Sequence, residues 1–382
     1  MTRVWSPRNI SVFLEAELGY DRQVMHGLRD YAGRHKPWRI RILRPAVYPD
    51  LRGLAGAIEG EDGIIGRFQN WEAVRLIESC GICAVNVATG LEEATIPRVG
   101  VDNDAVGELA AKHLLERGFR HFASYHHGYG WNSRRRGNGF WAGIASVMVV
   151  PERRRHVGGA GPSLEQWLRE LPKPVGLYVD TDPLGVETLE TCRVAGIAVP
   201  EHLALVSTDN DELMCDFALP RMSSVDLSGR QIGYEAAALL ERLMGGEAAP
   251  VGPTLVPPSR VVARHSSDVV AVDDADVAAA LRFIRATATQ PTGVRDVLEA
   301  VPVARRSLER RFRQAVGRSV LDEIRAVHVG RAKDLLSGTD LPAATVARLS
   351  GFRTAVRLSV VFHQLTGESP TVYRRRFRPT PV

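Results

Sequence analysis

The stretch AATVARLSGFRTAVRLSVVF, residues 343–362, decides the fold of the carboxyl-terminal part of this 382-residue chain. Apolar side chains recur at helical spacing on both sides of a break at Ser350-Gly351-Phe352; they are Val346, Leu349, Leu358, Val361 and Phe362. Gly351 permits the backbone angles of a tight turn, and the small Ala347 allows two helices to cross closely. The stretch therefore predicts a helix-turn-helix.

The second of these helices is expected to present cations and short hydrogen-bond donors to solvent. The side chains concerned are Arg353, Thr354, Arg357 and His363. Such a face suits the phosphates and base edges of a DNA major groove. From this stretch alone, a helical hairpin with a merely solvated basic face is an equally good interpretation.

An upstream copy of the pattern favours DNA binding. Residues 293–312 repeat the plan, with a break at Val301-Pro302 and apolar Leu308 and Phe312 four residues apart. Residues 320–336, between the copies, have the amphipathic pattern of one connecting helix. Two helix-turn-helix units on a rigid connector can enter successive major grooves, about 34 Å apart. The candidate DNA contacts of the first unit are Arg305, Arg306, Ser307, Arg310 and Arg311.

Residues 277–378 resemble the AraC family of bacterial transcription regulators. The residues that carry the resemblance are Leu308, Arg311-Phe312, Gly317, Val346-Ala347, Gly351-Phe352, Phe362, Gly367, Ser369-Pro370 and Tyr373-Arg374. The chain departs from the family pattern at His328, Val356-Arg357-Leu358 and Val360, so the DNA sequence that the second unit reads stays open. The resemblance implies double-stranded DNA as a partner and contact with RNA polymerase as a further possibility.

Charge is unevenly distributed along the chain. The formal net charge is +5, but residues 276–382 alone carry 19 Lys and Arg against 9 Asp and Glu. The carboxyl-terminal part is therefore the part expected to meet a polyanion. No apolar run approaches the roughly 20 residues that span a bilayer, and the amino terminus lacks the apolar core of a signal peptide. A cytoplasmic protein without a membrane partner is expected.

The four cysteines do not predict a disulfide framework or a metal site. Cys80 and Cys83 form a Cys-x-x-Cys, but no second cysteine pair or nearby histidine accompanies them. We therefore expect buried structural thiols rather than metal or redox chemistry, and we expect neither a metal nor a cofactor.

Residues 9–265 alternate β-rich runs with amphipathic helices, which is typical of wound parallel sheets. The predicted strands are 10–14, 38–43, 63–65, 84–87, 122–125, 175–179 and 203–207. The predicted helices are 21–35, 72–80, 104–117, 136–148, 164–171, 183–194 and 228–244. Two lobes fit this pattern better than one continuous domain.

Four phrases in this part resemble the LacI-type, periplasmic-binding-protein-like effector domain; they are residues 99–119, 179–185, 195–210 and 219–226. The resemblance implies a type I, two-lobed α/β sensor that binds a sugar between its lobes. The expected organisation is a sensor over residues 1–265, a linker over 266–276 and an all-α, AraC-type DNA-binding domain with two helix-turn-helix units over 277–382.

The resemblance also assigns candidate ligand contacts. Asp209-Asn210 ends a strand, where carboxylate and amide groups can bind vicinal hydroxyls, and the family places the Asp on the sugar. Arg136 precedes Gly137-Asn-Gly-Phe140 and resembles an arginine that opens a helix at the cleft, although it stands in a run of three arginines. Thr181 and Asp182 occupy another cleft position. Asp102 has two equal interpretations, a sugar contact and a helix cap.

Residues 13–27, which include Tyr20 and Asp21, resemble the loop that enters the cleft in the regulators of xylose operons. That branch also has this domain order, whereas LacI relatives carry their helix-turn-helix first. D-xylose or a related pentose is therefore the expected effector. Arg67 stands where that branch is expected to have an acidic residue, so a different pentose or a sugar acid is the alternative.

Two other classes of protein fit the sequence less well. A helix-turn-helix protein fused to a DNA-repair alkyltransferase needs a nucleophilic cysteine with nearby His and Arg, which Cys192 and Cys215 lack. Gly158-Gly-Ala-Gly161 lacks the preceding strand and following helix of a phosphate-binding loop, so it is expected to be a flexible loop. We therefore predict no catalytic residues, and a homodimeric transcription regulator in which sugar closes the lobes and repositions the DNA-binding domains.

Overall fold

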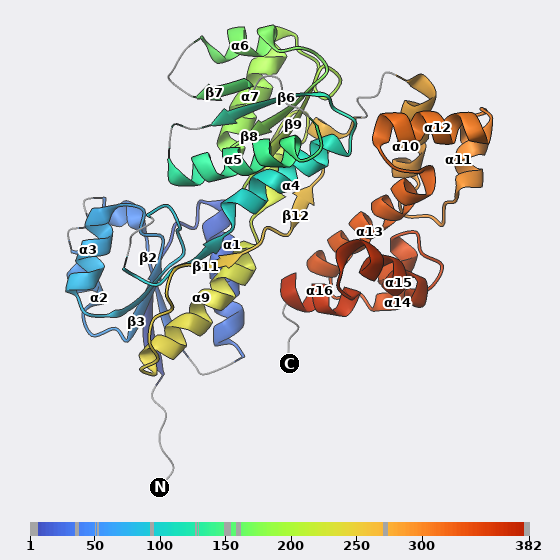
Figure 1. The fold of residues 1–382 in the computed structure, drawn as a ribbon. Helices are drawn as coiled ribbons and strands as arrows, with labels where there is room; N and C mark the ends of the chain where they lie inside the picture. The colour runs from blue at the N-terminus through green and yellow to red at the C-terminus, as the bar shows by residue number, and fades with distance from the viewer. Residues whose placement is uncertain are drawn as a thin grey trace.

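The computed structural model describes residues 7–34, 38–49, 51, 53–91, 95–126, 128, 130–148, 154–157, 162–269 and 274–377. The glycine cluster 158–161 lies outside the described residues. Figure 1 shows two α/β lobes, followed by a separate group of helices that ends the chain. None of the helices in these ranges is long and apolar enough to cross a membrane.

The first lobe contains a four-stranded parallel sheet in the order β2-β1-β3-β4. Its strands are β1 (Arg8–Phe13), β2 (Trp38–Leu43), β3 (Gly63–Gly66) and β4 (Cys83–Asn86). The helices α1 (Gly19–Ala32), α2 (Leu54–Ile58), α3 (Trp71–Ser79) and α9 (Gly229–Met244) accompany it. β3 is buried along its whole length, as expected for a central strand of a covered parallel sheet.

The second lobe contains a six-stranded sheet in the order β12-β10-β9-β8-β6-β7, in which only β12 is antiparallel to its neighbour. Its strands are β6 (His121–His126), β7 (Arg154–Val157), β8 (Val175–Val179), β9 (Leu203–Thr208), β10 (Ser223–Asp226) and β12 (Arg260–Val262). Its helices are α4 (Asn103–Leu115), α5 (Trp131–Ala145), α6 (Leu164–Glu170), α7 (Asp182–Ala195) and α8 (Glu212–Phe217). A separate parallel pair joins β5 (Val99–Val101) to β11 (Thr254–Val256).

Close packing of α4 on α5 fixes the position of the helix that carries Arg136. A Cβ atom added at Gly107 would lie 2.0 Å from the carbonyl oxygen of Arg136, and one added at Gly139 would lie 2.0 Å from that of Asp104. Only glycine permits so close an approach of two backbones. α5 begins at Trp131, so the expectation that Arg136 opens this helix is wrong: the helix starts five residues earlier.

The carboxyl-terminal part consists of seven helices within the described ranges: α10 (Ala275–Ala286), α11 (Val294–Ala300), α12 (Arg305–Val316), α13 (Val320–Gly338), α14 (Ala343–Leu349), α15 (Ala355–Thr366) and α16 (Pro370–Phe377). Two separate hydrophobic cores form, one around Leu308 and Phe312 and one around Val346, Leu358 and Phe362. α13 contributes side chains to both cores, which gives the two helix-turn-helix units and the connecting helix that the sequence predicts.

The turn of the second unit explains one departure from the AraC pattern. Gly351 has a φ of +77°, and a Cβ there would lie 2.5 Å from the ring of His328. His328 is buried and lies edge-on to Phe352 at 5.5 Å between ring centroids. The histidine therefore packs under the turn, and the fold expectation holds despite the substitution.

Two further details differ from the sequence expectations. Cys80 is exposed and Cys83 only half-buried, because the pair lies at the end of α3 and the start of β4, so the prediction of two buried thiols is wrong. Ser266 and Ser267, which begin the predicted linker, are fully buried: Ser266 donates to the carbonyl oxygen of Leu205 over 2.7 Å. We keep 266–276 as a proposed linker whose first residues are attached to the second lobe.

Candidate functional site: an interlobe cavity and two DNA-facing helices

A cavity of about 530 Å³ lies between the two lobes. The first lobe contributes the start of α1 and the segments that follow β3 and β4, and the second contributes the starts of α4, α5 and α7 and the ends of β8 and β9. The cavity thus lies at the carboxyl ends of parallel strands, where open α/β sheets bind ligands. Its volume is in the range of small-molecule sites.

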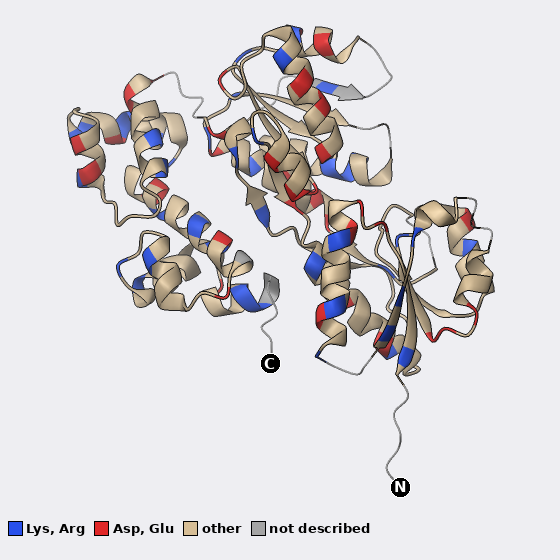
Figure 2. Ribbon diagram, turned by 180° about the vertical axis from the view of Figure 1, so that it is seen from behind, with Lys and Arg blue, Asp and Glu red and all other residues tan. Residues whose placement is uncertain are grey.

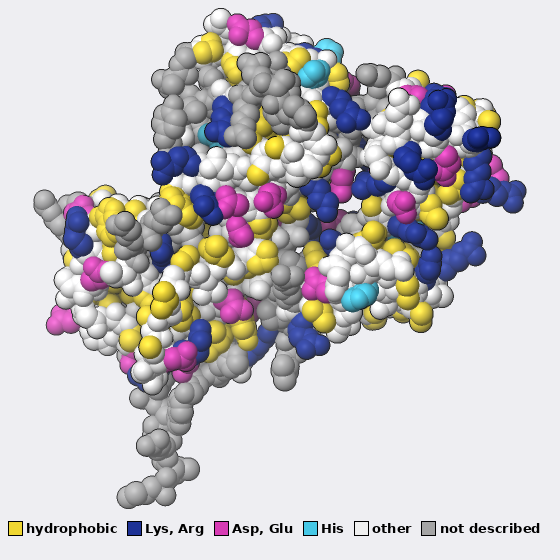
Figure 3. Space-filling model, viewed as in Figure 1, with side chains coloured by type: hydrophobic (Ala, Val, Ile, Leu, Met, Phe, Trp, Pro, Cys, Tyr) yellow, Lys and Arg dark blue, Asp and Glu magenta, His cyan; other side chains and the backbone are white. Residues whose placement is uncertain are grey.

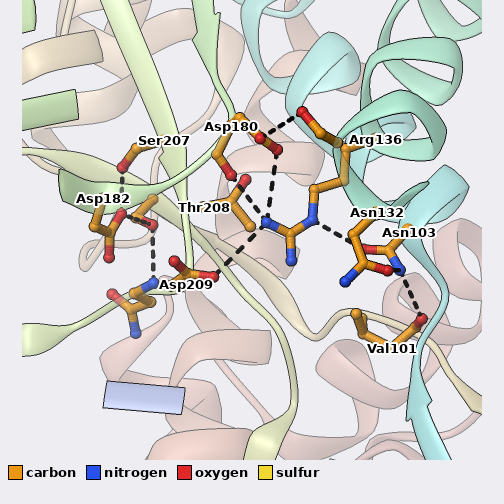
Figure 4. A network of polar contacts seen from close by, with 12 residues as sticks. Val101, Asn103, Asn132, Arg136, Asp180, Asp182, Ser207, Thr208 and Asp209 are labelled. Carbon is orange, nitrogen blue, oxygen red and sulfur yellow. Dashed lines mark hydrogen bonds and ion pairs between the residues drawn. The ribbon is translucent and has the colours of Figure 1, made fainter. Parts of the chain in front are cut away.

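Arg136 is the central cation of the cavity wall. Its Nε donates to the side-chain oxygen of Asn103 over 2.9 Å, and its Nη1 donates to the carbonyl oxygen of Asp180 over 2.9 Å. The same Nη1 lies 3.7 Å from a carboxylate oxygen of Asp180 and 3.8 Å from one of Asp209. Figure 4 shows the guanidinium between these two acidic groups and Asn103. Burial alone would lower the pKa of Arg136, but the two carboxylates raise it, so the group is a fixed cation.

Asp209 faces the cavity from the end of β9. Its φ of +112° is a left-handed conformation that is unusual for a side-chain-bearing residue. The side chain is 26% exposed because it borders the cavity, yet the surrounding lobes exclude most water. Burial raises the pKa of Asp209 to about 8, with Arg136 acting in the opposite direction. The carboxyl group can therefore hold a proton near neutral pH and either donate to or accept from a hydroxyl.

Asp180 is a cavity residue that the sequence analysis did not select. It is 4% exposed, and one carboxylate oxygen accepts from Ser133 Oγ over 2.6 Å. The other oxygen is buried and has no hydrogen-bond partner among the described residues; Arg136 Nη1 lies 3.7 Å from it. A buried acceptor without a hydrogen-bond partner is costly. The Asp-Thr-Asp run after β8 was the signal for it.

Other polar residues line the cavity without having been predicted from the sequence; they are Gln69, Thr89, Asn103, Asn132, Ser133 and Asp211. Asn103 donates to Thr89 Oγ1 over 3.2 Å and to Asn132 Oδ1 over 3.2 Å. These contacts join α4, α5 and the segment after β4 at one edge of the cavity. Their side chains are short and polar, and nothing in their local sequence distinguishes them from ordinary helix starts.

Asp182 borders the cavity but directs its carboxylate into the second lobe. It accepts from Ser207 Oγ, from Ser224 Oγ at 2.7 Å and from the backbone N–H of Asp211 at 2.7 Å. The side chain is fully buried. Its prediction as a ligand contact is corrected: Asp182 ties β9, β10 and the start of α8 together. Its neighbour Thr181 does line the cavity.

Asp102 and Asn210 do not line the cavity. Asp102 caps α4 by accepting from the N–H groups of Asp104 and Ala105 at 3.1 and 3.2 Å, so of its two interpretations the structure supports the cap. Asn210 accepts from Arg264 Nη1 at 3.0 Å, which turns it away from the ligand space. Both residues are therefore corrected from ligand contacts to structural ones.

Tyr20 and Arg67 line the cavity, whereas Asp21 lies behind them. The Tyr20 hydroxyl donates to the carbonyl oxygen of Val87 over 2.9 Å. Arg67 Nε lies 3.0 Å from a carboxylate oxygen of the buried Asp21, and Glu15 lies 3.9 Å from the same guanidinium. The unexpected arginine thus has its charge compensated within the first lobe, and Asp21 contacts Arg67 rather than the cavity.

The DNA-facing candidates lie on α12 and α15 and in the turns before them. Arg305, Arg306, Arg310, Arg353, Arg357 and His363 are exposed, as is Thr354, and Ser307 is half-buried. Figure 3 shows Lys and Arg side chains gathered on the outer side of this part, over α11 and α12, and Figure 2 shows the view from behind. Thr354 Oγ1 accepts from the N–H of Arg357 at 3.1 Å, so it also caps α15.

Arg311 differs from the other candidates. Its Nε donates to Asp274 over 2.6 Å, and its Nη2 lies 2.9 Å from Asp276. These carboxylates raise the pKa of Arg311 and fasten α12 to the start of α10. We therefore correct its assignment from a DNA contact to an ion pair that joins two helices.

Comparisons with known proteins find relatives of both the sensor part and the DNA-binding part. Residues 111–267 match the "Periplasmic binding protein-like domain" family, and residues 297–376 match a "Helix-turn-helix domain" family. The xylose operon regulatory protein of Escherichia coli K12 is 31% identical over 385 residues, covering 96% of each chain. That of Haemophilus influenzae is 29% identical, covering 96% of this chain and 97% of the relative.

Solved structures give the same result. The structure of the xylose-binding transcription activator XylR matches with 29% identity and a TM-score of 0.60, covering 97% of this chain and 98% of that one. The transcription regulator CcpA of Lactococcus lactis matches the sensor fold, with 18% identity, a TM-score of 0.58 and 69% of this chain covered.

The fold and the site define a DNA-binding transcription regulator, in which a sugar-binding sensor domain of the periplasmic-binding-protein type precedes an AraC-type pair of helix-turn-helix units. The chain belongs to the family of xylose operon regulatory proteins.

Proposed function

We propose that D-xylose, or a closely related pentose, binds in the interlobe cavity and controls the affinity of this chain for DNA. The observation that carries the proposal is the position of Arg136, a buried cation flanked by Asp180 and Asp209 at one wall of the interlobe cavity. Paired donors and acceptors of this kind bind adjacent hydroxyls, because each hydroxyl can donate to a carboxylate and accept from a guanidinium. The full-length relatives named for the xylose operon support the choice of sugar.

The ligand contacts that we propose are Tyr20, Arg67, Arg136, Thr181 and Asp209 from the predicted set, with Asp180 added. Asp180 and Asp209 approach Arg136 from one side, and Tyr20 and Arg67 belong to the opposite lobe. A sugar that contacts both groups would hold the lobes together. The sugar closes the lobes only if it binds the closed state more tightly than the open state.

The Arg67–Asp21 pair favours a neutral sugar over a sugar acid. A free arginine in the cavity would attract a carboxylate, but Asp21 at 3.0 Å already compensates this cation. A neutral pentose leaves that balance unchanged, whereas a sugar acid would add a further negative charge beside Glu15 and Asp21.

We further propose that the protein acts in the cytoplasm as a homodimer bound to an operator, with α12 and α15 in successive major grooves of each half-site. The exposed cations of both helices support this arrangement, because phosphate and guanine edges are the partners of such side chains. We also propose that the bound protein activates transcription through contact with RNA polymerase. Mass determination of the protein–DNA complex tests the dimer, and a reporter gene tests activation.

Calorimetry with a sugar panel tests the proposed effector. The full-length protein is titrated with D-xylose, D-ribose, L-arabinose and D-glucuronate, and its binding to the DNA upstream of its own gene is measured in parallel. D-xylose is expected to bind at one site per chain and to change the affinity for DNA. Retained DNA binding with no response to any pentose would overturn the effector assignment.

A further inference from the structure

A second cavity, of about 470 Å³, lies between the sensor and the DNA-binding part. Residues of α4 and β12 form its wall on the sensor side, and residues of α10 and α13 form the opposite wall. It shares no lining residue with the interlobe cavity. Among the hydrogen bonds that cross the junction beside it, Arg260 Nη1 donates to the carbonyl oxygen of Asp334 over 3.2 Å, and the Tyr373 hydroxyl donates to that of Ser259 over 3.3 Å.

The lining of this junction cavity is strongly cationic. Seven of its side chains carry a positive charge; they are Lys112, Arg117, Arg260, Arg285, Arg318, Arg331 and Lys333. Its carboxylates are Glu116, Glu323 and Asp334. The formal excess is therefore four positive charges, drawn from both halves of the protein.

The three carboxylates already have cationic partners. Arg318 pairs with Glu323 and lies 3.6 Å from Glu116, and Arg260 lies 3.3 Å from Asp334. Neither Lys112 nor Lys333 makes an ion pair with a carboxylate in the described part of the chain; the Lys333 ammonium lies 5.7 Å from the ring centre of Tyr373. Two lysines from opposite halves thus face one cavity without a neutralising anion.

Two further cations are bound mainly by backbone carbonyl groups. Arg117 Nε donates to the carbonyl oxygen of Ser267 over 2.6 Å, and Arg285 donates to those of Val269 and Glu116 over 3.1 and 3.3 Å. Carbonyl dipoles fix the direction of these guanidinium groups but do not cancel their charge. The cavity therefore retains a directed positive field.

The proximity of these cations has an electrostatic cost. Burial, followed by the charge of Arg285, lowers the pKa of Arg117 to about 9. Burial also lowers the pKa of Lys333, and Lys112 lowers it further. Like charges held together in a partly desolvated space repel one another, and an anion placed among them removes that repulsion.

We propose that the junction cavity is a second effector site, which binds a small anion carrying two or more negative charges, of the class of phosphorylated metabolites and polyphosphates. Lys112 on α4 and Lys333 on α13 contact the anion from opposite sides. The anion bridges the sensor and the DNA-binding part, and so it stabilises the arrangement in which α13 lies against α4 and β12. Its cavity is separate from the sugar cavity, although α4 borders both.

The test is calorimetric titration of the full-length protein with sodium pyrophosphate at constant ionic strength. One anion per chain is expected to bind. Lys112→Gln and Lys333→Gln should each weaken binding by about tenfold, the effect of losing one hydrogen bond to a charged group. The matched control is Arg193→Gln, an exposed cation on α7 that pairs with Glu190 away from the cavity; it should leave pyrophosphate affinity unchanged.

Retained D-xylose binding shows that each variant is folded. Fructose 1,6-bisphosphate, titrated in the same way, separates the two sources of the anion: tighter binding than that of pyrophosphate assigns the site to a sugar phosphate, and weaker binding assigns it to a polyphosphate. Equal pyrophosphate affinity in the parent protein and in both lysine variants would overturn the proposal. Displacement of pyrophosphate by duplex DNA would overturn it also, because the cations would then belong to the DNA-binding surface.

Discussion

Arg136 in the interlobe cavity donates a hydrogen bond of 2.9 Å to Asn103, which is the first residue of α4. The last turn of the same helix carries His113, whose Nε2 lies 2.8 Å from Ser267 Oγ. Arg117, just beyond the helix, donates to the carbonyl oxygen of Ser267. One rigid helix of about 20 Å therefore joins the ligand space to the segment that leads into the DNA-binding part.

This arrangement defines how sugar could influence DNA binding. A ligand that moves Arg136 displaces the start of α4, and the far end of α4 then shifts Ser267 and the contacts around Arg285. The coupling requires two arrangements of this helix with different sugar affinity, since a ligand that binds both equally shifts nothing.

The first prediction concerns Asp209. Asp209→Asn should weaken D-xylose binding by roughly 2- to 10-fold, which corresponds to the loss of a hydrogen bond of a protonated carboxyl group, worth about 0.5–1.5 kcal/mol. DNA affinity without sugar should be unchanged, because Asp209 lies in the sensor. Calorimetry and a DNA-binding assay measure the two effects. The control is Glu201→Gln, at an exposed position of the same lobe. An equal loss of D-xylose affinity in this control would contradict the assignment of Asp209 as a ligand contact.

A second prediction follows from the raised pKa of Asp209. Because the folded-state pKa of about 8 is above the usual value of about 3.9 in an unfolded chain, the folded state binds a proton that the unfolded state releases. The resulting stability is fully present below about pH 4 and is lost as pH rises through about 8. Urea unfolding without sugar measures this effect. Between about pH 5 and pH 8, which lies within that window, Asp209→Asn should lose less stability than the parent protein. Parallel pH profiles for the two proteins would contradict the assignment.

The third prediction tests the role of the Arg67–Asp21 pair. Asp21→Asn removes the carboxylate 3.0 Å from Arg67 and leaves a cation in the cavity with only Glu15 nearby. The ratio of D-glucuronate affinity to D-xylose affinity should rise by about tenfold, since a released ion-pair partner is worth about 1.4 kcal/mol here. Asp21→Asn combined with Arg67→Gln should restore the preference for the neutral sugar. An unchanged ratio in the single variant would show that Arg67 does not face the ligand.

The fourth prediction separates DNA contacts from structural ion pairs. Arg305→Ala and Arg353→Ala should each weaken DNA binding and reduce the salt dependence of the binding constant by about one ion. Arg311→Ala should lower the stability of the helical part instead, because it breaks the pairs with Asp274 and Asp276, and should leave the salt slope unchanged. If all three variants reduced the salt dependence of the DNA-binding constant equally, Arg311 would have to be assigned as a DNA contact.

The sequence predicted the helices well and the short strands poorly. α12 and α15 carry apolar residues at helical spacing, and glycines with positive φ end both, Gly317 and Gly367. β10, β11 and β12 contain only three or four residues. β10 buries Ser223 and Ser224 rather than an apolar pair, and no local pattern predicts strands of this kind.

The sequence was sufficient to predict those site residues whose role does not depend on partners from other strands. Arg136 and Asp209 came from the resemblance and lie together in the cavity. The choice between Asp180 and Asp182 could not be made in advance, because it depends on partners from other strands. Ser207 and Ser224 satisfy Asp182 from β9 and β10, whereas one oxygen of Asp180 is left without a hydrogen-bond partner among the described residues.

The most direct test of the central claim is the affinity of the full-length protein for the DNA upstream of its gene, measured with and without saturating D-xylose. We expect a change of roughly 5- to 150-fold, the usual range of a coupling free energy, and a smaller change in His113→Ala, in which the far end of α4 loses its contact with Ser267. An identical DNA affinity in both conditions, with D-xylose bound by calorimetry, would contradict it.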